Sequence, residues 1–451
     1  MTPLLMARGP VSATELAAAL RVDRSTVVRA LSRFGNELAT FGATRSTRYA
    51  LRRTVFPMGN RWPVYRIGET GRARLWATLE SYHDRRWRVV WPDAETAPVW
   101  ADRFLDADGM WEGFPFFLAD IRPQGFLGRT IARHLPRLLG LPEDPRLWSD
   151  DDTLLYLQAE GDDPPGALVV GEECLRRALS PPSGEAVPEQ DRPARYAALA
   201  STATEVAPGS SAGGEQPKFL ARVIDGSGTE RPVIVKFTPP VDQTTGQRWA
   251  DLLACEGLAS EILAGHGLTS HGTTVLDADG RRFLESSRFD RTDGGGRRGV
   301  VSLSALHPEA NAYGAAAWTR AAGELEADGL IDSETRSTIQ QLHAFGDWIG
   351  NSDRHAGNLA FWLDDTLPFR LAPAYDMLPM LWAPGPQGEI VERTFSPPPP
   401  LPGEEGTWLE TAGWALEFWE RAADLAGLSD GFRQIARNAA ELVQRSVARF
   451  G

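Results

Sequence analysis

Asn351-Ser352-Asp353-Arg354-His355-Ala356-Gly357-Asn358 is the most informative stretch of this 451-residue chain, together with Ala374-Tyr375-Asp376 downstream. Asp353 and Asn358 are five positions apart, and Asp376 follows Asn358 by eighteen positions, so that a short hairpin would return it to the same place. Each of these residues alone is an ordinary turn former. Together they predict a site in which one carboxylate accepts a proton, while a second carboxylate and an amide hold a metal ion, because Mg²⁺ prefers oxygen ligands.

Two lysines support this interpretation. Of the 47 basic residues only Lys218 and Lys236 are lysines. Lys236 lies in the β-branched run 233–237, which predicts a buried strand. Lys218 closes the glycine-containing loop 210–218, although we assign it no direct role in chemistry. A glycine-rich loop followed by a strand lysine is typical of a site that binds nucleotide phosphates, and the five-residue Asp–Asn spacing is that of a protein-kinase catalytic loop. The alternative is that two lysines remain by chance in an arginine-favouring chain.

These motifs, with Arg288-Phe289-Asp290-Arg291, resemble the HipA family of serine/threonine kinases, which are toxins of bacterial toxin–antitoxin modules. The resemblance covers about residues 70 to 450. It implies an α+β, two-lobed, protein-kinase-like fold, with ATP and Mg²⁺ as cofactors.

The resemblance also implies roles for individual residues. Asp353 is the catalytic base, and Asn358 and Asp376 are metal ligands. The implied ATP-binding residues are Ala212, Gly213, Gly214, Glu215, Gln216, Pro217, Lys236, Glu256, Ser287, Arg288, Phe289, His355, Asn358, Tyr375 and Asp376. Ser210 matches the serine that the family autophosphorylates, which expels the loop and switches the kinase off. Glu215-Gln216 departs from the family pattern, but backbone N–H groups can cradle a phosphate whatever the side chains are.

The first 66 residues differ from the rest in charge. They hold eleven arginines and three acidic residues, a net charge of +8, whereas the other 385 residues carry −21. Residues 12–15 form a capping box that opens a helix through Leu20, and Asp23 caps a second helix to about Phe34. On this second helix we expect Val27, Val28, Leu31 and Phe34 to face the core.

The outward residues of the second helix are Arg24, Ser25, Thr26 and Arg29, and they predict a recognition helix for the DNA major groove. Residues 44–53, with Arg45 and Arg48, resemble the basic hairpin of a winged helix. The expected partner is duplex DNA. The alternative is a small protein-interaction domain with a solvated basic face.

We therefore expect four segments: a winged helix-turn-helix domain (1–66), an α/β subdomain with a linker (67–200), a kinase N-lobe (201–300) and a helical C-lobe (301–451). Two cysteines are too few for a disulfide framework, and no run of residues has the length of a membrane span, so we expect a cytoplasmic protein with no membrane partner.

The sequence thus predicts an ATP-dependent serine/threonine protein kinase that carries its own DNA-binding domain for autoregulation. Its expected partners are a protein substrate, duplex DNA and either an antitoxin or its own inhibitory segment. Two alternatives stay open: a nucleotide-sensing transcription regulator with a non-catalytic kinase fold, and a small-molecule kinase, because a fold does not determine the acceptor.

Overall fold

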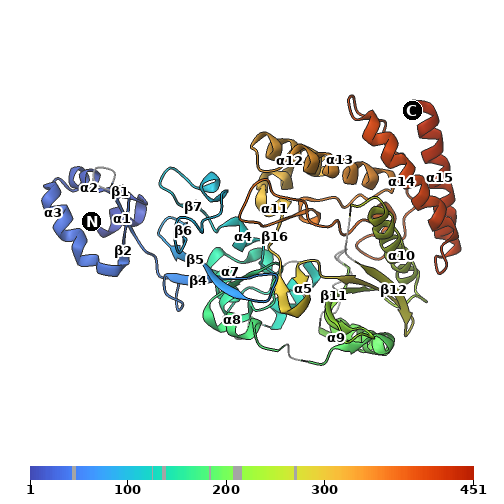
Figure 1. Cartoon of the computed structure of the whole chain (residues 1–451), viewed down its shortest axis with the longest axis horizontal. Coiled ribbons are helices and arrows are strands. Elements are labelled where there is room, and N and C mark those ends of the chain that lie inside the picture. The colour runs from blue at the N-terminus through green and yellow to red at the C-terminus, as the bar shows by residue number, and fades with distance from the viewer. Residues whose placement is uncertain (43–46, 124, 135–138, 182–183, 207–215, 269–271) are drawn as a thin grey trace.

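The computed structural model describes residues 1–451 except 43–46, 124, 135–138, 182–183, 207–215 and 269–271. The chain runs along the longest axis of the molecule, from a small N-terminal module through a middle domain to the kinase-like lobes (Figure 1). The two C-terminal helices lie at the end opposite the module. Among the residues that the structure describes, no helix is both long and apolar enough to span a lipid bilayer.

The N-terminal module is a winged helix. Its elements are α1 (Thr2–Ala7), β1 (Val11–Ser12), α2 (Ala13–Leu20), α3 (Arg24–Leu31), the 3₁₀ helix η1 (Ser32–Glu37), β2 (Leu38–Phe41) and β3 (Arg48–Leu51), with a sheet of order β1-β3-β2. The predicted capping box is present, because Ser12 Oγ accepts from Glu15 N at 3.1 Å and Ser12 N donates to Glu15 Oε2 at 2.7 Å.

Three details of the module differ from the prediction. The second helix ends at Leu31 rather than near Phe34, because η1 tightens the chain there. Asp23 occupies the N-cap position, but its side chain makes no capping hydrogen bond. Val28 is 42% exposed, so it lies on the outer face of α3, while Val27 packs in the core.

The middle domain is built on a five-stranded sheet of order β7-β6-β5-β4-β8. Its elements are β4 (Arg61–Ile67), β5 (Ala73–Ser81), β6 (Arg86–Val90), the 3₁₀ helix η3 (Ala101–Phe104), β7 (Trp111–Glu112), α4 (Phe116–Ala119), α5 (Gly125–His134), η4 (Pro145–Leu147), α7 (Asp150–Glu160), β8 (Leu168–Val170) and α8 (Glu172–Ala178). Buried tryptophans, including Trp62, Trp76 and Trp87, fill its core.

The predicted boundary at residue 66 is therefore wrong. Strand β4 lies between β5 and β8, so residues 61–67 belong to the middle domain. Arg61 pairs with Glu80 at 3.0 Å and Arg66 with Asp365 at 2.6 Å, so neither side chain contributes to the N-terminal module. Without them, residues 1–60 hold nine arginines and three acidic residues, a net charge of +6.

The N-lobe has a second five-stranded sheet, of order β12-β13-β11-β10-β9. Its elements are β9 (Val187–Pro188), η5 (Glu189–Asp191), α9 (Arg192–Val206), β10 (Lys218–Ile224), β11 (Glu230–Phe237), α10 (Thr244–Gly265), β12 (Thr273–Ala278) and β13 (Arg281–Ser287). Val233, Val235, Phe237 and Phe283 form its own hydrophobic cluster with Tyr196 of α9.

The C-lobe is mostly helical. Its elements are β14 (Arg291–Thr292), η7 (Asp293–Gly295), β15 (Gly296–Arg297), β16 (Val300–Ser302), α11 (Leu303–Leu306), η8 (Pro308–Ala312), η9 (Gly314–Ala316), α12 (Ala317–Ala327), α13 (Ser333–Trp348), η10 (Ala356–Asn358), β17 (Ala360–Trp362), η11 (Met380–Trp382), α14 (Glu405–Asp424) and α15 (Asp430–Phe450). Its core is continuous with that of the middle domain and with one face of α10. The middle domain thus supports the lobe that carries the catalytic motif.

Candidate active site

Lys236 lies at the centre of the candidate site. Strand β11 carries it and α10 carries Glu256, and both side chains are buried, with 8% and 7% exposure. Lys236 Nζ donates to Glu256 Oε1 at 2.5 Å and also to Asp376 Oδ1. The structure thus contains the pair of Lys236 and Glu256 that the resemblance implies, and it adds Asp376 to it.

Opposite charges keep Lys236 and Asp376 ionised in a buried place. Burial alone would lower the pKa of Lys236, but the carboxylates of Asp376 and Glu256 hold that pKa above its usual value. Burial would raise the pKa of Asp376, but Lys236 and Lys218 hold it well below its usual range. Burial raises the pKa of Glu256. Lys236 therefore keeps a positive charge that is able to bind phosphate oxygens at neutral pH.

Lys218 belongs to the same cluster, which the sequence analysis missed. In the antiparallel pair of β10 and β11, Lys218 lies directly opposite Lys236. Residues at opposed positions point to the same face of a sheet. The charge of Lys218 also lowers the pKa of Asp376. The sequence held a signal for this, since Lys218 and Lys236 are the only two lysines among 47 basic residues.

The catalytic loop follows directly from the end of α13. Gly350 has a φ of +70°, and a Cβ atom there would lie 2.8 Å from the Trp382 ring. Asn351 is buried, and its Oδ1 accepts from Asp353 N at 3.0 Å while its Nδ2 donates to the Asp376 carbonyl oxygen at 3.3 Å. Asn351 therefore ties the loop of Asp353 to the segment of Asp376, a positioning role that the sequence alone did not assign.

Asp353 itself is exposed at the wall of a cavity. The cavity has a volume of about 710 Å³, and its lining includes Ser352, Asp353, Arg354, His355, Thr394 and Ser396. Partial desolvation raises the pKa of Asp353, the carboxylate of Asp376 also raises it, and His355 opposes them. A raised pKa makes this carboxylate a better proton acceptor than an ordinary surface aspartate.

Asn358 and Asp376 offer oxygen atoms that fit a magnesium ion. Asn358 Nδ2 donates to the Asp353 carbonyl oxygen at 2.9 Å, which leaves Oδ1 as an acceptor. The predicted hairpin returns Asp376 to the loop, as Trp362 N donates to Arg370 O at 2.8 Å. Within the described ranges no group of three or more His, Cys, Asp or Glu side chains forms a metal site. Two protein oxygens suit Mg²⁺, which usually takes its remaining ligands from water and substrate phosphates.

Asp376 has a φ of +56°, in the left-handed region that non-glycine residues rarely adopt. Such backbone strain persists where surrounding contacts fix the residue, and it clusters at functional sites. The bonds from Lys236 and Asn351 are the contacts that hold Asp376 here.

Aromatic rings lie beside the predicted hinge. Phe289 stacks on Tyr375 with ring centroids 5.9 Å apart, and Tyr375 Oη donates to Gly357 O at 2.8 Å. Ser287 ends β13, and its Oγ accepts from Arg231 Nη1 at 3.0 Å. Phe289 and Tyr375 therefore form an aromatic pair beside the predicted hinge.

The Arg288 side chain does not share that position. It is 8% exposed, and its guanidinium group donates to Asp290 at 2.9 Å and to Asp163 of the middle domain at 2.9 Å. The prediction that Arg288 contacts ATP is thus wrong for the side chain, which stabilises the junction with the middle domain. Its backbone is engaged as well, because Arg288 N donates to Pro232 O at 3.0 Å and Arg288 O accepts from Arg291 N at 3.1 Å.

The end of the phosphate loop is anchored to the lysine strand. Gln216 Nε2 donates to the Phe237 carbonyl oxygen, and Phe237 N donates to Pro217 O at 3.0 Å. His355 Nδ1 accepts from Gly357 N at 3.0 Å, which orients its ring within the catalytic loop. Ser210, Ala212, Gly213, Gly214 and Glu215 lie outside the described residues.

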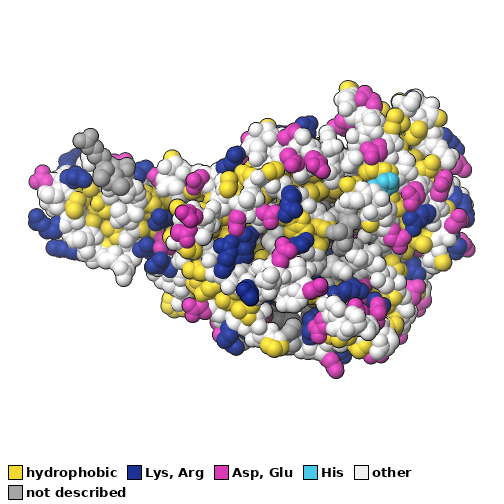
Figure 2. All heavy atoms as spheres, in the orientation of Figure 1, with side chains coloured by type: hydrophobic (Ala, Val, Ile, Leu, Met, Phe, Trp, Pro, Cys, Tyr) yellow, Lys and Arg dark blue, Asp and Glu magenta, His cyan; other side chains and the backbone are white. Residues whose placement is uncertain are grey.

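The predicted DNA-binding residues divide into two groups. Arg24, Ser25, Thr26 and Arg29 are all exposed on α3, and basic side chains lie on the outer side of the module over this helix (Figure 2). Arg48 instead forms an ion pair with Asp108 of the middle domain. The predicted DNA contact of Arg48 would thus compete with this ion pair and stays a prediction, and Arg45 lies outside the described residues.

Comparisons with known proteins identify the family of this chain. The family model of the HipA-like C-terminal domain matches residues 210–449, and that of the middle domain of YjjJ-like toxins matches residues 58–179. The toxin YjjJ of Escherichia coli (strain K12) is 36% identical over 458 residues, which cover 100% of this chain and 99% of that protein.

Among solved structures, HipA of Shewanella oneidensis MR-1, in a complex with HipB and its operator DNA, has a TM-score of 0.51 at 15% identity. The match covers 86% of this chain and 97% of that one. The Helicobacter pylori kinase CtkA matches with a TM-score of 0.33 and 11% identity over 50% of this chain and 90% of CtkA, which is too low to carry an argument. Together with the kinase-like fold, the family model and the full-length relative show that this chain belongs to the HipA-like family of toxins.

Proposed function

We propose that this chain is an ATP-dependent serine/threonine protein kinase of the HipA type. The observation that carries the proposal is the cluster of Lys236, Glu256 and Asp376, tied by Asn351 to the loop of the exposed Asp353. The proposal is supported by the closeness of a cation suited to bind phosphate, a carboxylate suited to bind a metal ion and a carboxylate suited to accept a proton. These are the parts that phosphoryl transfer requires.

Each residue has a defined task in this reaction. Lys236 binds phosphate oxygens of ATP, and Glu256 keeps the ammonium group in place. Asn358 and Asp376 would hold Mg²⁺, which neutralises charge on the transferred phosphoryl group. Asp353 takes the proton of the acceptor hydroxyl while the oxygen of that hydroxyl bonds to the γ-phosphorus. The bond from that phosphorus to the bridging oxygen breaks, and ADP leaves.

The test uses γ-³²P-labelled ATP with the purified protein and a cell extract. We expect labelled protein with the wild type and labelling that is about 10² to 10⁴ times slower with Asp353→Asn, while both proteins bind ATP. A nucleotide sensor would bind ATP and transfer no label. A small-molecule kinase would form ADP and put the label into the small-molecule fraction of the extract.

We further propose that Ser210 is autophosphorylated. The support is the match of residues 210–218 to the family pattern, and the end of this loop is anchored beside Lys236 through Phe237. A phosphate on Ser210 adds about 1.5 to 2 negative charges beside the site for the ATP phosphates, which should disfavour ATP binding. Mass spectrometry after incubation with Mg-ATP should find phosphate on Ser210. Phosphate found only on Thr394 or Ser396, which share the Asp353 cavity, would contradict this assignment.

We propose that the N-terminal module binds duplex DNA through α3. The support is the winged-helix fold, the net charge of +6 on residues 1–60 and the exposure of Arg24, Ser25, Thr26 and Arg29. The HipA relative was solved together with HipB and operator DNA. In this chain the module would supply the DNA contact itself, with or without a separate antitoxin. ATP and DNA are both cytoplasmic ligands, and we propose that the chain acts there.

A further inference from the structure

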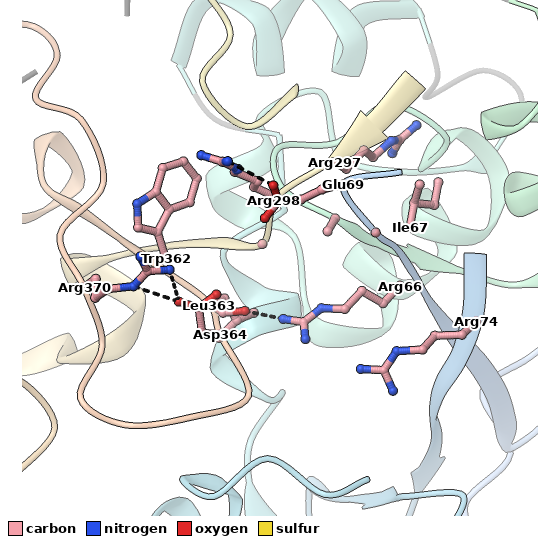
Figure 3. Close-up of a pocket in the computed structure, with 13 residues that line it drawn as sticks. Arg66, Ile67, Glu69, Arg74, Arg297, Arg298, Trp362, Leu363, Asp364 and Arg370 are labelled. Carbon is pink, nitrogen blue, oxygen red and sulfur yellow. Dashed lines mark hydrogen bonds and ion pairs between the residues drawn. The ribbon is translucent and has the colours of Figure 1, made fainter. Parts of the chain in front are cut away.

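A second cavity lies between the middle domain and the C-lobe, with a volume of about 480 Å³ (Figure 3). Its lining includes β4 and β5 residues on one side, and β15, β17 and the turn after β17 on the other. None of the residues that we place in the active site lines it. Five of its lining residues are arginines: Arg66, Arg74, Arg297, Arg298 and Arg370.

Positive charge exceeds negative charge around this cavity. Glu69 and Asp364 are the carboxylates among the residues that line it. Arg298 pairs with Glu69 at 2.9 Å and Arg370 with Asp364 at 2.8 Å. Asp365, next in the chain, serves both Arg66 at 2.6 Å and Arg74 at 2.9 Å. Four guanidinium groups therefore share three carboxylates, and the fifth, that of Arg297, pairs with none of them.

Arg297 contributes the least compensated charge. It is 6% exposed, its Nη2 donates to the Asp162 carbonyl oxygen at 2.7 Å, and its Nη1 is buried without a hydrogen-bond partner. Within the part of the chain that the structure describes, no carboxylate lies at ion-pair distance from it. Burial, together with the nearby Arg291, lowers the pKa of Arg297 to about 10. Asp163 and Asp290 compensate this charge only from a distance, and a buried cation without a direct ion pair favours the binding of an anion.

Three of the other arginines are accessible. The side chains of Arg74, Arg298 and Arg370 are 48%, 43% and 71% exposed. A guanidinium group has five N–H donors, so that one carboxylate partner leaves donors for a further acceptor. Arg298 also packs over the Trp362 ring at 5.3 Å, which limits its motion. Figure 3 shows Arg66 and Arg370 approaching Leu363 and Asp364 from opposite sides.

The close approach of the two walls depends on Gly299. A Cβ atom there would lie 2.8 Å from Leu363 O and 3.1 Å from Arg66 Nη2. The absence of a side chain at this position lets the C-lobe strand lie against the arginine of the middle domain. The cavity is therefore a defined feature of the junction between the two parts.

We propose that this cavity binds the phosphate group of a small ligand. The planar forks of several arginines match phosphate oxygens in pairs, which is the geometry that arginine recognises best. A volume of about 480 Å³ suits a small molecule and not a folded partner. The ligand is thus inorganic phosphate or a small phosphate monoester. Its binding is separate from the nucleotide site of the proposed kinase.

Calorimetric titration of the full-length protein tests this proposal at constant ionic strength set with chloride. One arm uses inorganic phosphate, and the other uses ribose 5-phosphate, which lacks an adenine ring. We expect the wild type to bind at least one of them, and Arg298→Gln/Arg370→Gln to bind it at least about tenfold more weakly. Tighter binding of ribose 5-phosphate identifies a monoester as the ligand, and equal or weaker binding identifies inorganic phosphate.

Two controls locate the binding. Arg421→Gln/Arg445→Gln removes two arginines of matched exposure, 45% and 71%, from the far helices, and it should bind phosphate as the wild type does. Lys236→Met should also keep the phosphate affinity, because Lys236 does not line this cavity. No binding by the wild type, unchanged binding by the folded Arg298→Gln/Arg370→Gln variant, or loss of binding in Lys236→Met would overturn the proposal. None of these outcomes depends on kinase activity.

Discussion

The catalytic core and the N-terminal module use charged residues in opposite ways. In the core, Lys236, Glu256 and Asp376 are bonded to one another, and Lys236 and Glu256 are buried. On α3 of the module, Arg24 and Arg29 are exposed, and among the described residues neither has an ion-pair partner. Small changes of geometry therefore matter in the core. In the module, DNA binding would add up several solvated contacts, so a single substitution should lower DNA affinity only in part.

The largest expected effect is that of Asp353→Asn. Asn keeps the shape of the side chain but accepts no proton, and a positioned general base contributes about 10² to 10⁴ in rate. We expect phosphoryl transfer to fall by that factor while ATP affinity stays nearly unchanged, as measured by single-turnover transfer and by calorimetry. Unchanged turnover would remove Asp353 from its role.

The pH dependence gives a second check on Asp353. The base acts only when it is deprotonated, and its pKa is raised by partial burial and by Asp376. The rate should therefore fall as the pH drops through a value above the ordinary range of an aspartate. A rate that stays flat down to the usual pKa of aspartate would contradict this environment.

Lys236→Arg should have the next largest effect. Arginine keeps the charge, but its planar fork does not fit a buried site in which one ammonium group binds both Glu256 and Asp376. We expect activity to fall by more than about tenfold with a rise in KM for ATP. Wild-type activity of this variant would show that the site does not require a lysine at position 236.

Lys218→Arg is the matched control, and its effect should be smaller. Lys218 lies opposite Lys236 on the same face of the sheet, but it is only half-buried, so a longer side chain has room. We expect a loss of a few-fold in affinity for ATP, since its charge still acts on Asp376. A loss as large as that of Lys236→Arg would make the two lysines equivalent.

The sequence predicted which residues of the core lie together, because its motifs are local and chemically specific. The spacing of Asp353 and Asn358 indicated the catalytic loop, and the strand pattern around Lys236 indicated its burial. Contacts between distant segments were not predictable in this way. Strand register determines the position of Lys218 opposite Lys236. Packing of distant segments determines the link from Asn351 to Asp376 and the ion pair of Arg288 with Asp163.

Domain limits in the N-terminal part were harder to predict for the same reason. The run of arginines from 45 to 66 looked continuous in charge, but the chain enters the middle-domain sheet at Arg61. Packing of the domains produces three ion pairs, Arg48 with Asp108, Arg52 with Glu80 and Arg53 with Asp151. No local pattern in the sequence indicates which arginines face solvent and which face a carboxylate.

Changing both arginines of α3 tests the N-terminal module in the same way. Arg24→Ala/Arg29→Ala in the full-length protein should weaken binding to the chain's own promoter by about tenfold or more, because base and phosphate contacts are both lost. The slope of log affinity against log salt should decrease by about 0.9 for each phosphate contact removed. Gel shifts across salt concentrations measure both, with Arg437→Ala/Arg445→Ala on α15 as the control. If both double variants bind DNA equally well, the alternative of a protein-interaction domain is favoured.

The smallest effect should come from releasing the wing. Asp108 holds Arg48, and its carboxylate also pairs with Arg86 at 2.8 Å. Asp108→Asn keeps the shape of the side chain and removes the charge, so Arg48 becomes available to a DNA phosphate. A partly exposed ion pair contributes about 0 to 1 kcal/mol, so the gain in affinity for random-sequence DNA should not exceed about fivefold. Asp430→Asn removes the same charge at the opposite end of the molecule, and it should leave DNA binding unchanged. The slope of log affinity against log salt should become steeper for Asp108→Asn alone, since one more phosphate contact releases one more set of counterions.

If both variants bind DNA equally, Arg48 is no part of the DNA surface. Its pair with Asp108 then only stabilises the contact between the module and the middle domain.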